Sequence, residues 1–233
     1  MEWQAIEALG TVGAVVVAVL SGVIRAMWGW ARRPRLDLDF QDRDPWKRHA
    51  MVGEDPQRRE PFWYFRVSVH NAGHAPAEGV TGWASSFTSA GVRRDDFDEV
   101  PLHWVGTGYG QPTGITILPG QTAYLDVFRF RARGLAGGAE IELVLQDPTP
   151  RGTEVTAPFV SDVAVTVAVA AKNVPCRELG LSVHGDVGSD VSKIAVAGHD
   201  IAPTGWTPEA FAESWQLHRK SLGVWSERRS GRD

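Results

Sequence analysis

The segment Phe62–His70 (FWYFRVSVH) decides the fold, because its apolar and polar residues alternate with a period of two. In an extended chain Phe65, Val67 and Val69 fall on one side, while Arg66 and its alternate neighbours fall on the other. This is the pattern of a half-buried β-strand. We therefore predict a strand over this segment, with its apolar side turned into a core.

The same alternation predicts further strands along the chain. The apolar positions are Leu36, Leu38 and Phe40; Ala123, Leu125 and Val127; Ile141, Leu143 and Leu145; Val163, Val165, Val167 and Val169; and Leu179, Leu181 and Val183. Turn-forming Asn, Gly and Pro residues separate the segments, and no helical period is evident between Arg35 and Gly198. About seven to nine short strands predict an all-β fold, an antiparallel β-sandwich over residues 31–203.

An apolar segment precedes the predicted sandwich. Ala5–Ile24 (AIEALGTVGAVVVAVLSGVI) is long enough, at about 1.5 Å per residue, to cross a hydrocarbon core of about 30 Å. Its only ionisable residue is Glu7, at its N-terminal edge. We predict a transmembrane α-helix over residues 5–30, after a short extracytoplasmic N-terminus of residues 1–4.

The charges that follow this segment set the expected orientation. Arg25, Arg32, Arg33 and Arg35 lie on its C-terminal side, and residues 1–4 contain no Lys or Arg. By the positive-inside rule, the N-terminus lies outside the cell membrane and the β-domain is cytoplasmic. The single cysteine, Cys176, allows no intrachain disulfide, which fits a reducing compartment.

Small residues recur at every fourth position of the apolar segment and form one ridge of the expected helix. They are Gly10, Ala14, Ala18 and Gly22. Such ridges allow two helices to pack closely in lipid. A homo-oligomer, or pairing with another membrane helix, is therefore a further hypothesis, although an Ala- and Gly-rich composition also produces this spacing.

Two segments carry a more specific pattern. Arg66–Val80 (RVSVHNAGHAPAEGV) has the form x-V-x-V-x-N-x-G, followed by a small residue and a valine that begin a new strand. Ile115–Phe130 (ITILPGQTAYLDVFRF) has a Leu-x-Gly turn with proline in the middle, ahead of an alternating strand. The matching positions are Val67, Val69, Asn71, Gly73, Ala77, Val80, Leu118, Pro119 and Gly120.

These segments resemble bacterial immunoglobulin-like domains of the cell-adhesion-related (CARDB-like) type. The chain as a whole resembles bacterial single-pass membrane proteins that carry such a domain behind an arginine-flanked span. The resemblance implies an immunoglobulin-like sandwich but no particular activity, because this architecture hosts many functions. Adhesion-type members lie outside the cell, whereas the charges here predict an inside domain, so adhesion is not expected.

The C-terminal segment predicts an amphipathic helix over residues 207–222. Thr207 and Pro208 form a helix start, and Gly223 weakens the last turn. The aromatic and apolar stripe consists of Phe211, Trp215, His218, Leu222 and Trp225. Three interpretations stay open: packing on the sandwich, binding a partner, or returning to the membrane interface. Residues 223–233 are expected to be disordered.

Two long connections, Gln41–Pro61 and Phe87–Pro101, are candidate recognition loops, and solvated loops are the alternative. A tryptophan exposed beside basic residues is typical of an interface hot spot. The candidate interaction surface therefore comprises Trp46, Lys47, Arg48, Arg93, Arg94, Phe211 and Trp215.

No pattern of catalytic or metal-ligating residues is found. His70 and His74 flank a turn without further ligands, and the glycines at 106–110 lack the Lys of a phosphate-binding loop. The net charge of -4 comes from interspersed charges, which argues against nucleic acid. We predict no enzyme, no metal and no cofactor.

The sequence thus predicts a membrane-anchored, non-enzymatic protein-interaction module with a cytoplasmic immunoglobulin-like sandwich and a protein partner. The alternative is an extracytoplasmic ligand-binding or envelope-associated domain. A less favoured hypothesis is a metal-dependent enzyme with a site built from loop histidines and acidic residues.

Overall fold

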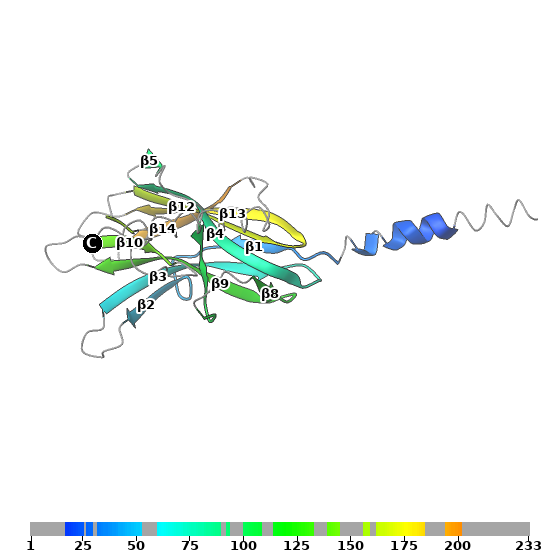
Figure 1. Cartoon of the computed structure of the whole chain (residues 1–233), viewed down its shortest axis with the longest axis horizontal. Helices are drawn as coiled ribbons and strands as arrows, with labels where there is room; N and C mark the ends of the chain where they lie inside the picture. The colour runs from blue at the N-terminus through cyan, green and yellow to red at the C-terminus, as the bar shows by residue number, and fades with distance from the viewer. Residues whose placement is uncertain are drawn as a thin grey trace, which may run out of the picture.

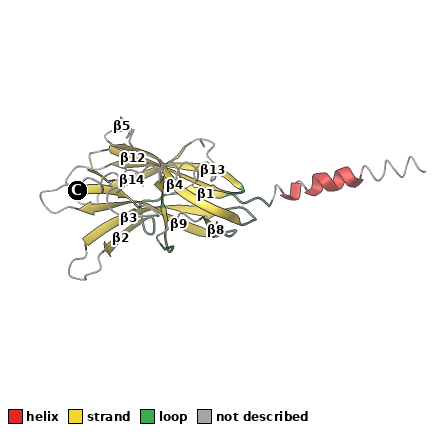
Figure 2. Ribbon diagram, viewed as in Figure 1, coloured by secondary structure: helices red, strands yellow, loops and turns green. Residues whose placement is uncertain are grey.

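A computed structural model of the 233-residue chain contains a short N-terminal helix and a body of β-strands (Figure 1). The structure describes residues 17–25, 27–29, 32–52, 60–89, 92–93, 100–108, 114–132, 139–144, 156–158, 162–184 and 194–201. The helix comprises residues 17–25 and 27–29, and Figure 2 shows it in red, clear of the yellow strands.

The described strands form two sheets in which every pairing is antiparallel. The first sheet has the order β1-β3-β9-β10-β11, with β2 also paired to β3 and β7 to β9. Its strands are β1 (Leu36–Asp39), β2 (Lys47–Val52), β3 (Glu60–Asn71), β7 (His103–Trp104), β9 (Thr122–Ala132), β10 (Ala139–Leu143) and β11 (Thr156–Pro158).

The second sheet has the order β14-β13-β12-β4-β5, with β6 and β8 also paired to β4. Its strands are β4 (Ala77–Ser89), β5 (Val92–Arg93), β6 (Val100–Pro101), β8 (Ile115–Ile117), β12 (Asp162–Ala171), β13 (Val174–His184) and β14 (Ala195–Ile201). The all-β prediction and the two-sheet arrangement are therefore confirmed.

The core lies between the sheets and is filled from the positions that the alternation predicts. Phe65, Val67 and Val69 of β3 are fully buried, as is Leu125 of β9, which pairs with Val67. The Phe65 ring stacks on Phe128 with centroids 4.8 Å apart. Burial of aromatic and branched side chains from both sheets supplies the main stabilisation.

The count of seven to nine strands is too low, because the two predicted loops contain strands. The first loop, Gln41–Pro61, holds β2, whose residues KRHAMV show no apolar alternation. Lys47 pairs with Phe65 and so takes an inward position at the sheet edge. An inward charge on an edge strand is a known protection against edge-to-edge aggregation, and it hides the strand from pattern analysis.

The second predicted loop, Phe87–Pro101, is likewise wrong in part. The strand β4 continues through it to Ser89, and β5 and β6 follow. From β6 the chain crosses to the first sheet, where β7 pairs with β9.

Asn71 joins the helix-bearing segment to the sandwich. Its Oδ1 accepts hydrogen bonds from the backbone N–H groups of Arg35 (3.2 Å) and Gly73 (3.0 Å). Its Nδ2 donates to the carbonyls of Ala75 (2.8 Å) and Ile117 (2.9 Å). The side chain is fully buried, so these four bonds hold the entry segment, the turn after β3 and the strand β8 together.

The predicted transmembrane helix falls largely on residues that the structure does not describe. Residues 5–16, 26 and 30 lie outside the described part, and within that part no helix has the length and apolar character needed to cross a membrane. The predicted C-terminal helix 207–222 and tail 223–233 also lie outside the described residues.

Candidate functional site

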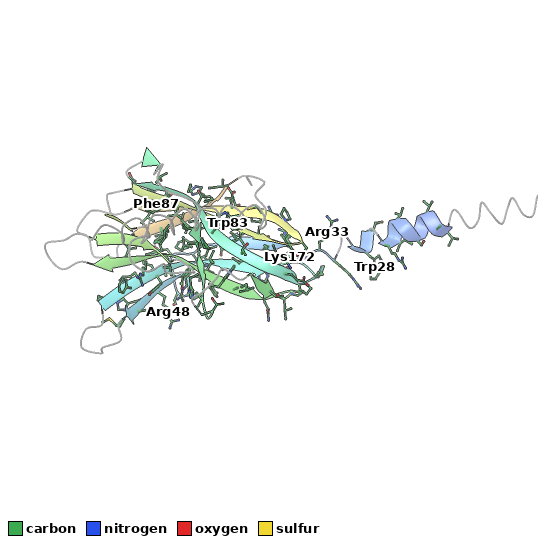
Figure 3. All side chains as sticks on the ribbon, in the orientation of Figure 1. Trp28, Arg33, Arg48, Trp83, Phe87 and Lys172 are labelled. Atoms are coloured by element: carbon green, nitrogen blue, oxygen red, sulfur yellow. The ribbon has the colours of Figure 1, made fainter. Side chains whose placement is uncertain are left out.

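A pocket of about 400 Å³ opens on the outer face of the first sheet, where β2, β3, β9 and β7 meet. Its charged and aromatic lining residues are Arg48, His49, Tyr64, Arg66, His103 and Asp126. Figure 3 shows Arg48 on β2, well away from Trp28 of the helix.

Strand register places three ionisable residues in a row across the floor of this pocket. Asp126 of β9 pairs with Arg66 of β3 on one side and with His103 of β7 on the other. Residues directly opposite each other in an antiparallel pair point to the same face, so all three side chains lie on the outer face. The chain crossing from β6 to β7 is what brings His103 there.

The three side chains form a buried hydrogen-bonded cluster. Arg66 Nε donates to Asp126 Oδ1 at 2.6 Å, and His103 Nδ1 lies 3.4 Å from Asp126 Oδ2. His103 Nε2 lies 3.0 Å from the Thr107 carbonyl, which can only accept, so Nε2 carries a hydrogen. The side chains of Arg66, Asp126 and His103 are only 11%, 7% and 8% exposed.

The pocket has more basic than acidic groups. Asp126 is the only carboxylate among the described lining residues, and Arg66 and His103 already contact it. Arg48 and His49 are exposed at the rim, and Arg66 lies over the Tyr64 ring at 5.9 Å. The exposed Arg48 guanidinium at the rim suits the arrangement to binding of an anionic group.

Among the predicted interaction residues, Trp46 is less exposed than expected. It is half-buried and packs against the core, with its ring edge-on to Tyr124 at 6.1 Å. The Arg43 guanidinium lies 5.6 Å from its ring centroid. The indole Nε1 is buried without a hydrogen-bond partner among the described residues. The prediction that Trp46 is exposed is therefore wrong, whereas its place in an interaction surface stays a prediction.

Lys47 is also mostly buried, with a side chain that is 11% exposed. Its Nζ donates to the Ile194 carbonyl at 3.0 Å and lies 3.0 Å from Asp42 Oδ1. Its role is to join the two sheets at an edge. Arg48, the next residue, points outward and reaches the pocket rim, as the alternation of β2 requires.

The other predicted interaction residues are not brought to this site by the described structure. Arg93 lies in β5, at the far edge of the second sheet, and its side chain is not described. Arg94, Phe211 and Trp215 lie outside the described residues.

The small-residue ridge is described only in its second half. Gly10 and Ala14 lie outside the described residues, whereas Ala18 and Gly22 lie in the helix with exposed positions. A Cβ built at Gly22 would meet no atom within 4 Å, so this side of the helix is open.

The four arginines that set the predicted topology lie at the helix end and in the link to β1. Arg25 ends the stretch 17–25, and Arg32 lies over the Trp28 ring at 4.8 Å. Arg33 and Arg35 are exposed, and Arg35 pairs with Asp37 at 3.1 Å.

The described histidines do not gather into a metal site. His184 lies 3.1 Å from Asp162, and His70 lies 3.0 Å from the Thr122 hydroxyl. Within the described ranges, no group of three His, Cys, Asp or Glu side chains is placed to hold a metal ion.

Comparison with known proteins gives no match: no family model, no curated protein and no solved structure is similar to this chain.

Proposed function

We propose that the protein is a membrane-tethered, non-enzymatic interaction module whose β-sandwich recognises a protein partner at the cytoplasmic face. The observation that carries the proposal is the exposure of the N-terminal helix. Its large apolar side chains are 50% to 66% exposed. They are Val17, Val19, Leu20, Val23, Ile24, Met27 and Trp28. A helix that exposes so much apolar surface is unfavourable in water and favourable in lipid.

The apolar sequence continues N-terminally from this helix to Ala5, which would give a span of the required length. The arginines at its C-terminal end favour a cytoplasmic sandwich by the positive-inside rule. The fold and the Asn71 and Pro119 motifs favour the immunoglobulin-like, CARDB-like family as the source of the domain.

The pocket on the first sheet is the proposed recognition site. Arg48 at its rim is exposed and has no ion-pair partner among the described residues. An acidic side chain of a partner protein would find a charge-assisted donor there, next to the Tyr64 ring. Tethering raises the effective concentration of the module for partners at the membrane.

Membrane insertion and orientation are tested with the full chain. The proposal expects the protein to stay in vesicles through carbonate washing, and release into the wash contradicts it. An alkaline phosphatase fused after Asp233 should be inactive and a fluorescent protein at the same position should be bright. The reverse result would favour the alternative, an extracytoplasmic ligand-binding or envelope-associated domain.

Recognition is tested with an oligo-glutamate peptide as the probe and calorimetric titration as the readout. The Arg48→Glu variant should bind at least roughly tenfold more weakly than the original chain, because a charged hydrogen bond is replaced by repulsion. Arg177→Glu, the same change at an exposed arginine on the other sheet, is the matched control and should bind normally. Equal binding by both variants would remove the pocket from the proposal.

Helix pairing through the small-residue ridge is a separate element of the proposal. Replacing Ala18 or Gly22 by Leu should lower the yield of crosslinked dimer in membranes, because close helix approach needs small side chains. An unchanged yield contradicts pairing through this ridge.

A further inference from the structure

The outer face of the second sheet can be assigned residue by residue from the strand register. A Cβ added to Gly82 would fall 2.5 Å from a methyl of Leu125 in the first sheet, so Gly82 faces the core between the sheets. Its neighbour Trp83 must then face outward. Trp83 pairs with Ala168, so Ala168 and its alternate neighbour Ala170 in β12 also face outward.

This outer face is covered at one end. Trp83, Ala168 and Ala170 have 0% exposure, and Glu178, which pairs with Ala168, has 6%. Further along β12, Ala164 on the same face is half-exposed. The strands paired with β4 at Trp83, β12 and β6, lie beside it in the sheet rather than above it. Trp83 lies in β4, and Figure 3 shows its label over the sandwich. A fully buried outward tryptophan needs another segment lying across it.

The chain itself supplies a segment at the right place. β14 ends at Ile201, which pairs with Glu178 at the border of the covered region. The 32 residues that follow (233 minus 201) lie outside the described part of the chain. Residues 202–206 can span about 15 Å when extended, and β4 lies only about 10 Å from β13, two strand spacings away. The predicted helix can therefore begin above Trp83.

The chemistry of the segment also matches the covered face. The apolar stripe of residues 207–222 contains Phe211 and Trp215, which suit a flat surface made of Ala168, Ala170 and the Trp83 ring. The same segment carries three basic residues at positions 218–220, opposite in charge to the Glu178 carboxylate. Small residues on a sheet let a helix approach closely, which increases the dispersion contacts.

We propose that residues 207–222 dock as an amphipathic helix on the outer face of the second sheet, over Trp83, Ala168, Ala170 and Glu178. This intramolecular contact makes the C-terminal stripe part of the domain. The stripe is then unavailable to the bilayer or to a partner, and the N-terminal helix alone provides the membrane contact. The sandwich has one free outer face, that of the first sheet with its pocket.

The test uses thiol labelling of the full chain in a Cys176→Ala background, which removes the native thiol. Ala168→Cys reports on the covered end of the face, and Ala164→Cys is the matched control on the same strand and face. The thiol at 168 should react at least roughly tenfold more slowly than the thiol at 164, because it becomes accessible only by local opening.

The occupant is identified by substitutions at two neighbouring residues, which lie about 100° apart around the predicted helix. Trp215→Asp should speed labelling at position 168 at least roughly tenfold and leave labelling at position 164 unchanged. Gln216→Asp, the control, should leave both rates unchanged. A similar increase in labelling at position 164 would indicate general unfolding. In that case docking is tested by crosslinking pairs of cysteines with a short bis-maleimide. Crosslinking of cysteines at 168 and 215, without crosslinking of cysteines at 168 and 216, supports docking.

Several outcomes would overturn the proposal. Labelling at 168 that is as fast as at 164, or that stays slow in Trp215→Asp, excludes residues 207–222 as the cover. Protection at 168 that depends on protein concentration assigns the face to a second copy. Protection that appears only with anionic lipid vesicles assigns it to the membrane. Absence of the 168–215 crosslink, or an equal 168–216 crosslink, contradicts the proposed orientation.

Discussion

Replacing Asn71 by Ala should destabilise the protein far more than the same change at an ordinary surface asparagine. The substitution removes four hydrogen bonds, to the backbone of Arg35, Gly73, Ala75 and Ile117. Each is worth about 1 kcal/mol net, so their sum is about 4 kcal/mol. That is a large part of the 5–15 kcal/mol by which typical domains are stable.

Asn173 is the matched control because it lies in the neighbouring turn between β12 and β13. It makes two exposed bonds, a 3.5 Å contact with the Glu78 N–H and a 3.2 Å bond to the Pro76 carbonyl. Its groups are solvated when a partner is lost, so Asn173→Ala should cost at most about 1 kcal/mol.

The assay is urea unfolding of the purified full chain in mild detergent, followed by tryptophan fluorescence. With a slope of about 2 kcal/mol per molar urea, Asn71→Ala should lower the midpoint by about 2 M and Asn173→Ala by no more than about 0.5 M. Asn71→Asp should resemble Asn71→Ala, because its second oxygen faces the carbonyls of Ala75 and Ile117. Equal shifts of the urea midpoint in Asn71→Ala and Asn173→Ala would refute the conclusion that Asn71 holds the entry segment, the turn after β3 and β8 together.

Three further predictions concern the core, the pocket and the buried thiol. Gly82→Ala should lower the free energy of unfolding by about 1–3 kcal/mol, because its Cβ meets Leu125, and Leu125→Ala in the same chain should reduce that loss. Asp126→Asn should cost about 3 kcal/mol by leaving Arg66 buried without its counter-charge, and a chain that also carries Arg66→Met should recover part of it in the same urea assay. Burial, with a smaller effect from the charge of Glu178, raises the pKa of Cys176 from 9.0 to about 11. Because the folded chain favours the neutral thiol, this pKa difference stabilises the fold fully below pH 9, and the stabilisation is lost as the pH rises through 11. Cys176→Ala lacks the thiol, so between pH 8 and 11 its free energy of unfolding should fall by roughly 2 kcal/mol less than that of the original chain. Equal losses in the two chains would contradict that assignment.

The strands that could be predicted from sequence are those whose burial follows a simple period. Phe62–His70 alternates because one face of β3 lies on the core and the other is more exposed. The turn residues around Asn71 and Pro119 can be recognised in the sequence for a different reason. They make hydrogen bonds that connect one strand to the next. Asn71 forms backbone bonds with the turn that contains Pro119, through the N–H groups of Asn71 and Gly120.

The pocket could not be predicted, because no local pattern identifies it. Arg66 and Asp126 occupy outward positions that alternation alone marks as solvated. Their side chains are shielded because they contact each other and His103 of β7, and β7 is too short to leave a periodic signal. His103 joins them only through pairing between residues 23 positions apart. Such a cluster cannot be found by pattern analysis, because its residues are far apart in the sequence.

Trp46 is half-buried although its charged neighbours are typical of a solvated loop, because the strand β2 begins at the next residue. Charged neighbours made the segment look solvated, although Lys47 points inward and uses its ammonium group to join the two sheets. Charged residues in an edge strand can therefore serve to prevent edge-to-edge aggregation, and they do not show that the strand is exposed.

The way the helix joins the sandwich restricts where a partner can be met on the proposed topology. The N–H of Arg32 still bonds to the Trp28 carbonyl of the helix at 3.0 Å, and the carbonyl of the next residue, Arg33, already accepts from the N–H of His74 at 3.4 Å. The two bonded residues, Arg32 and Arg33, are adjacent in the chain, so on the proposed topology the sandwich begins directly after the helix. Figure 3 shows Arg48 well away from Trp28, so on the proposed topology a partner bound at Arg48 contacts the sandwich at a distance from the bilayer.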